Sequence, residues 1–123
     1  MATHEKEIVN GPKACVVAVV VDETCYAVEY MTAVKCRPRF DARFRTLAQV
    51  GKLRNPDYMR KLEGEVWEIK VDQGPGRRIY GCWQGRVFVL THGSDKPKKV
   101  AGEVRRAERI FAGWKSKEAG GQK

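Results

Sequence analysis

Long apolar segments are absent from this chain of 123 residues. Its longest uncharged apolar run, Ala14 to Val21, is far shorter than the ~20 residues that a membrane-spanning helix requires. The N-terminus shows no basic region followed by an apolar stretch and a cleavage site, so no secretory signal is predicted. We therefore expect a cytoplasmic protein of one domain that does not interact with membranes.

The chain has four cysteines and two histidines. None of the four cysteines belongs to a C-x-x-C pair, and we interpret them as buried thiols. The two histidines have no partners at metal-ligand spacing, and no nucleophile–base–acid triad is visible. Gly74-x-Gly76 is too short and wrongly placed for a dinucleotide-binding fingerprint. We expect neither a metal nor a cofactor.

Positive charge is abundant and unevenly distributed. The chain carries a net charge of +9, with −3 in residues 1–34, +7 in 35–61, zero in 62–92 and +5 in 93–123. Two basic segments that the fold brings together would form a face suited to a phosphate polymer. The alternative is that these cations lie on solvated helix faces without a partner.

The hydropathy pattern predicts one domain over residues 14–115 between two flexible tails, 1–13 and 116–123. The β-branched run 14–21 indicates a strand buried on both faces. Helical periodicity follows over 23–36 and resumes after Pro38, which predicts an αα-hairpin.

The second half of the chain is predicted to be mainly strand. Residues 66–71 alternate, placing Glu68 and Lys70 on one face, and the segments 77–83 and 86–92 flank a tight hairpin turn. An amphipathic helix is expected over 100–114. The element order predicts an α+β domain with helices packed on a mainly antiparallel sheet.

Basic residues of this sheet are the candidate catalytic groups. RNA carries its own nucleophile, the 2′-OH, so a small protein needs only to position it, move protons and stabilise the charge at phosphorus. Histidine titrates in the range useful for proton transfer, although by spacing alone His92 is better explained as a hydrogen-bonded histidine at a strand end. The candidates are Lys70, Arg77, Arg78, His92 and Lys96.

Further cations on the helices and the last loop are candidates for RNA binding. Guanidinium groups bind phosphate through paired donors, and lysine binds it as a point charge. This predicted set is Arg39, Arg43, Arg45, Lys98, Lys99 and Arg105.

One stretch of residues carries a family resemblance. Residues 61–70 (KLEGEVWEIK), followed by RRIY at 77–80, VFVLTHG at 87–93 and the Lys98-Lys99 pair before a helix, resemble HigB-like toxins of the RelE superfamily, in its phage-derived branch. The chain departs from the family's pattern in the loop 93–99, and no tyrosine follows Tyr80.

The resemblance implies a RelE-like fold and a ribosome-dependent mRNA endonuclease that a helix-turn-helix antitoxin neutralises. It implies that Lys70 takes the basic position at the sheet centre and that Arg77, or its neighbour Arg78, opens the next strand. Lys96, Lys98 or Lys99 would take the basic position after the last strand.

Two other hypotheses are open. The chain is either a non-catalytic RNA- or protein-binding module of phage or bacterial origin, or a protein whose helix 100–115 docks another chain through Phe111 and Trp114.

Overall fold

The computed structural model describes residues 2–121. Within that range six strands and three helices follow in the order β1 (Thr3–Asn10), β2 (Cys15–Val21), α1 (Tyr26–Ala33), α2 (Arg37–Val50), β3 (Met59–Lys61), β4 (Val66–Val71), β5 (Arg77–Gln84), β6 (Val87–Asp95) and α3 (Val100–Gly121).

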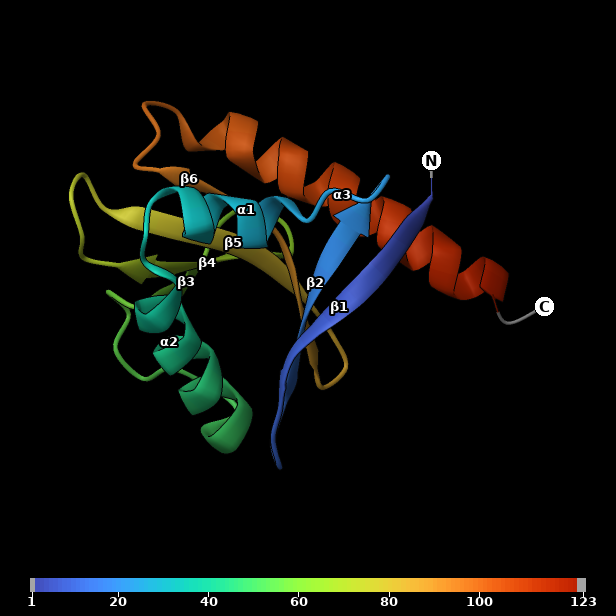
Figure 1. The fold of residues 1–123 in the computed structure, drawn as a ribbon, viewed down its shortest axis with the longest axis horizontal. Helices are drawn as coiled ribbons and strands as arrows, with labels where there is room; N and C mark the ends of the chain where they lie inside the picture. The colour runs from blue at the N-terminus through green and yellow to red at the C-terminus, as the bar shows by residue number, and fades with distance from the viewer. Residues whose placement is uncertain (1, 122–123) are drawn as a thin grey trace.

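The strands form a single sheet in the order β1-β2-β6-β5-β4-β3, in which β2 and β6 are parallel and the other pairs are antiparallel. Helices α1 and α2 pack on one face of this sheet, and α3 crosses the other face (Figure 1). The predicted α+β class, with a mainly antiparallel sheet and a C-terminal helix, is confirmed.

Strand β2 is buried on both faces, as its unbroken apolar sequence predicted. Val16 and Ala18 belong to the core beneath α1 and α2, whereas Val17 and Val19 belong to the core beneath α3. Successive side chains of a strand point to opposite faces, so a strand covered by helices on both sides must be apolar throughout.

The predicted αα-hairpin is present. Pro38 lies in the first turn of α2, where its missing N–H removes no helical hydrogen bond. Phe40, Phe44 and Leu47 recur at helical spacing and are fully buried. The helix ends at Val50, and the φ of 90° at the following Gly51 lets the Gly51 N–H bond the Leu47 carbonyl.

The prediction of a flexible tail over residues 1–13 is wrong for residues 3–10, and Met1 lies outside the described range. Residues 3–10 form β1, which pairs antiparallel with β2 and leaves most of its charged side chains in solvent. A polar, charged sequence is common in an edge strand because one face and one backbone edge meet water. Hydropathy alone therefore could not distinguish it from a loose end.

The second tail, predicted over 116–123, is also corrected in part. Helix α3 continues to Gly121, so residues 116–121 are helical, while residues 122–123 lie outside the described range. Among the described residues, no helix combines the length and the apolar character needed to cross a membrane.

A register shift in the central pair of strands affects the position of several polar side chains. Between β5 and β6, Tyr80 pairs with His92 and Gly81 with Leu90, so Thr91 is an extra residue in β6. This β-bulge places His92 on the same face as Tyr80, beneath α3.

Candidate functional site

A polar cavity of about 220 Å³ lies at the end of the sheet formed by β3, β4 and β5. Four cationic and two acidic side chains line it, so its lining is electropositive. The lining residues are Pro56, Asp57, Tyr58, Met59, Arg60, Glu68, Lys70, Arg78 and Lys96.

Strand register brings the charged residues of the cavity together. Arg60 lies opposite Glu68 across β3 and β4, and Lys70 lies opposite Arg78 across β4 and β5. Directly paired residues of neighbouring strands project to the same face, with about 5 Å between their Cβ atoms. The alternation over 66–71 predicted this face correctly for Glu68 and Lys70, whose neighbour Ile69 is buried in the opposite core.

Glu68 is the acidic centre of this group. It is only 2% exposed and accepts a hydrogen bond from Arg78 Nε at 2.6 Å, while Arg60 Nε binds its other carboxylate oxygen. Arg78, itself 6% exposed, also donates to the Gly76 carbonyl at 3.1 Å. A buried charge is tolerated when it is paired and hydrogen-bonded, and both conditions are met here.

Lys70 and Lys96 are the two cations of the cavity that are not paired with Glu68. Lys70 is about one-third exposed and lies 3.4 Å from the largely exposed carboxylate of Asp72. Lys96 is exposed in the segment between β6 and α3. Because solvent-exposed ion pairs contribute little free energy, Lys70 can exchange Asp72 for another anion at small cost.

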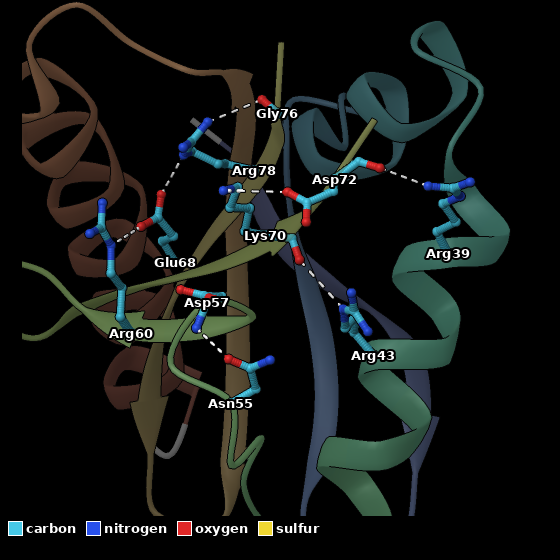
Figure 2. Close-up of polar contacts among 10 residues, drawn as sticks. All are labelled: Arg39, Arg43, Asn55, Asp57, Arg60, Glu68, Lys70, Asp72, Gly76 and Arg78. Carbon is cyan, nitrogen blue, oxygen red and sulfur yellow. Dashed lines mark hydrogen bonds and ion pairs between the residues drawn. The ribbon is translucent and has the colours of Figure 1, made fainter. Parts of the chain in front are cut away.

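Helix α2 contributes two arginines beside the cavity (Figure 2). Arg39 donates to the Asp72 carbonyl at 2.8 Å, and Arg43 donates to the Lys70 carbonyl at 3.4 Å. The guanidinium of Arg43 also lies 3.5 Å from the centroid of the Tyr58 ring, a cation–π contact. Both arginines of this predicted RNA-binding set therefore bind the end of the strand that carries Lys70.

Arg77 is not part of the cavity. It points to the opposite face of the sheet, where its Nη1 lies 2.5 Å from Asp95 Oδ1, and Tyr30 donates to the same oxygen at 2.8 Å. The Arg77 guanidinium holds the pKa of Asp95 below its ordinary value. Of the two neighbouring arginines, the structure brings Arg78 and not Arg77 to Lys70, because successive residues of β5 face opposite sides.

His92 is likewise separated from the cavity by burial. Its side chain is 1% exposed, stacks on Tyr80 at 4.8 Å between ring centroids, and lies 2.9 Å from Glu103 Oε1 on α3. Burial lowers the pKa of His92, although the hydrogen bond to Glu103 acts in the other direction. The expected proton-transfer histidine therefore joins β6 to α3 inside the protein, away from the cavity.

The remaining predicted RNA-binding cations lie on the surface. Arg45 is exposed on α2, Arg105 is exposed on α3, and Lys98 and Lys99 lie exposed just before α3. None of these four lines the cavity. They therefore make no contact with a group bound in the cavity.

Sequence reasoning missed four polar or charged residues of the cavity, Asp57, Tyr58, Arg60 and Glu68. Arg60 lies on the three-residue strand β3, which is too short to give a periodic signal, and Glu68 was visible only as an alternating neighbour of Lys70. Asp57 and Tyr58 follow Asn55, whose side chain accepts a hydrogen bond from the Asp57 N–H at 2.9 Å. The sequence Asn55-Pro56-Asp57 is typical of a turn, but a turn alone does not reveal which cavity it borders.

Comparison with known families identifies the family of this chain. The sequence profile described as "Phage derived protein Gp49-like (DUF891)" matches residues 33–111, which include every residue of the cavity. The chain belongs to this Gp49-like family. No curated protein and no solved structure matches it.

The Gp49-like family belongs to the RelE/HigB-like toxin superfamily, whose members are generally RNase toxins of toxin–antitoxin systems. The resemblance stated from residues 61–99 is thus confirmed at the level of the superfamily. The matched range begins at the end of α1, so β1, β2 and most of α1 lie outside it.

Proposed function

We propose that this Gp49-like protein is the toxin of a type II toxin–antitoxin system and that it cuts mRNA on the ribosome, in the cytoplasm, without a metal ion. The observation that carries the proposal is the cavity in which Arg60, Lys70, Arg78 and Lys96 converge. A cluster of this kind binds a phosphodiester and stabilises the additional negative charge of its transition state.

In the proposed reaction the 2′-OH of one nucleotide attacks the adjacent phosphorus, and the bond from phosphorus to the 5′-oxygen breaks. The products are a 2′,3′-cyclic phosphate and a free 5′-OH. Arg60, Lys70 and Lys96 bind the phosphate oxygens, and Arg78 is held behind them by Glu68. Positioning and charge stabilisation thereby supply most of the acceleration.

Proton transfer requires one group that accepts the 2′-OH proton and one that protonates the 5′-oxygen. Of the two carboxylates in the cavity, Glu68 is buried between two arginines, whereas Asp57 is exposed. We assign Asp57 as the acceptor. The ammonium groups of Lys70 and Lys96 are the donors available to the leaving oxygen.

The exposed cations are assigned to docking. Arg45, Lys98, Lys99 and Arg105 would bind ribosomal RNA, and Arg39 and Arg43 would bind the substrate strand near the cavity. A helix-turn-helix antitoxin that covers part of this basic surface would neutralise the toxin. Coexpression with the reading frame adjacent to the gene should then restore growth.

Inducible expression in a bacterium tests the reaction. The wild-type chain should arrest growth and produce new 5′-OH ends in mRNA, located by primer extension. Lys70→Ala combined with Lys96→Ala should lower the cleavage rate by about 10²-fold or more. Lys6→Ala, in the edge strand β1 at the other end of the sheet, is the matched control and should cut like the wild type.

Two outcomes contradict the proposal: growth arrest without cuts, which would indicate a non-catalytic binding module, or cleavage that survives the double change. Requirement for the ribosome is tested separately, by adding purified ribosomes to an mRNA that the isolated protein leaves intact.

A further inference from the structure

A second cavity adjoins the cavity of the proposed cleavage site. It has a volume of about 380 Å³ and lies between the end of α2 and the segment leading to β3. Tyr58 lines both cavities, so the two meet at this side chain. Of the residues that line the second cavity, only Arg43 was among the site residues predicted from the sequence.

The walls of this cavity combine apolar surface with cations. Val50, which is 45% exposed, and the half-buried Leu53 supply aliphatic surface. Arg43, Lys52 and Arg54 supply positive charge, and no acidic side chain lines the cavity. A ligand with a flat apolar body and a negatively charged backbone matches both properties.

Planar groups at the shared wall favour an aromatic ligand. The Arg43 guanidinium is stacked on Tyr58 at 3.5 Å from the ring centroid, and its Nε is bonded to the Lys70 carbonyl. Both contacts hold the guanidinium plane in one orientation before any ligand arrives. Nucleobases stack on aromatic rings and on guanidinium planes, largely independently of sequence.

From these observations we propose that the second cavity, lined by Arg43, Val50, Lys52, Leu53, Arg54 and Tyr58, binds one unpaired nucleobase of a single-stranded RNA. The inference rests on the proposed function, because it places the phosphate next to that base in the cavity of Lys70 and Lys96. The base enters against the Arg43–Tyr58 stack, and Lys52 and Arg54 bind the neighbouring backbone. A base in a duplex is stacked on both sides and cannot enter, so the site selects unpaired RNA.

Binding of an uncleavable strand tests this site without requiring the reaction. The probe is a short, fluorescein-labelled 2′-fluoro oligouridylate, which lacks the attacking hydroxyl, compared with strands that carry one abasic nucleotide at successive positions. Affinity for the full chain is measured by fluorescence anisotropy. Removal of the base at one position should weaken binding by about 10-fold, the typical effect of losing one base stack.

Variants then test whether the weaker binding of an abasic strand arises in this cavity. Arg43→Lys keeps the charge but removes the plane, and Tyr58→Leu removes the ring; each should abolish the difference between base-containing and abasic strands. Lys6→Gln removes a cation from the distant edge strand and should preserve the difference. Circular dichroism checks that each variant is folded.

The inference is overturned if no abasic position weakens binding, if free single-stranded RNA does not bind, or if both Arg43→Lys and Tyr58→Leu retain the difference. Equal binding of all strands would leave a protein side chain, such as one from an antitoxin, as the occupant. The proposed function fails by a different result, cleavage that is indifferent to Lys70 and Lys96, so the two failures are distinguishable.

Discussion

Arg78 and Glu68 form a buried ion pair between neighbouring strands β5 and β4, with 2.6 Å from Nε to Oε1 and less than a tenth of either side chain exposed. Arg60 binds the second oxygen of the same carboxylate. The pair neutralises charge that would otherwise be buried alone. Lys70 and Lys96 are the cations of the cavity that have no bond to Glu68.

This pair should be important for stability. Glu68→Ala leaves Arg78 buried without its counter-ion, and we expect the free energy of unfolding to fall by about 3–5 kcal/mol. Urea denaturation followed by circular dichroism measures the change. Asp41→Ala, which removes the partly exposed pair with Arg37 on α2, is the comparison and should cost only about 0.5 kcal/mol. Similar losses for both variants would contradict a stabilising role specific to the buried pair.

Arg77 should matter for folding and not for cleavage. Tyr30→Phe removes one hydrogen bond to the carboxylate of Asp95 and should lower stability by about 0.5–1.5 kcal/mol. Arg77→Gln should lower stability as well, while cleavage by the folded fraction stays near that of the wild type. Primer extension, normalised to the amount of folded protein, measures the cleavage. A loss of cleavage comparable to that of the Lys70 and Lys96 variants would show that Arg77 takes part in the reaction.

Stability should depend on the protonation of His92. The pKa of His92 is lowered in the folded state, so the unfolded chain binds a proton first as the pH falls. The stabilising contribution is therefore complete above the unfolded pKa of about 6.5 and is lost as the pH decreases below it, by at most about 1.4 kcal/mol per pH unit.

Urea titrations between neutral and mildly acidic pH measure this slope, and His92→Gln should flatten it. NMR titration of the His92 ring in the wild type gives an independent reading. An imidazole that titrates at or above its ordinary pKa would refute the prediction.

Substitution of Gly93 should destabilise the folded protein. A Cβ at this position would collide with the ring of Tyr30 and approach Ile79 Cδ1 to 2.8 Å. Gly93→Ala should cost about 1–3 kcal/mol, because a packed core cannot accept the added volume without strain. Gly113→Ala on α3 meets nothing within 4 Å and should stabilise the helix by about 0.5–1 kcal/mol. Thermal denaturation of the two variants should therefore shift in opposite directions.

Parts of the candidate site could be predicted from local pattern. The alternation over 66–71 placed Glu68 and Lys70 on one face, because the side-chain period of a strand is fixed by its backbone. The choice between Arg77 and Arg78 could not be made in this way. Both open the same strand, and which of them faces Lys70 depends on the register between β4 and β5.

The position of His92 also depends on tertiary structure. This residue was predicted at the end of a strand, whereas β6 continues to Asp95, and the extra residue Thr91 changes which face His92 occupies. Burial beneath α3 depends further on how that helix crosses the sheet, which no segment of the sequence encodes by itself. A residue type suited to proton transfer was thus assigned a role that its surroundings do not support.

The sequence by itself determined the α+β class, the helix over 100–114, the doubly buried strand that precedes α1 and the two basic segments, because periodicity and charge are properties of contiguous residues. Only the tertiary structure decided that residues 3–10 complete the sheet, that Arg60, Glu68, Lys70, Arg78 and Lys96 meet, and that Arg77 and His92 lie elsewhere. Those outcomes depend on strand register and on packing between distant segments. Such contacts form when the whole chain buries its apolar surface, and they leave no periodic trace in any one segment.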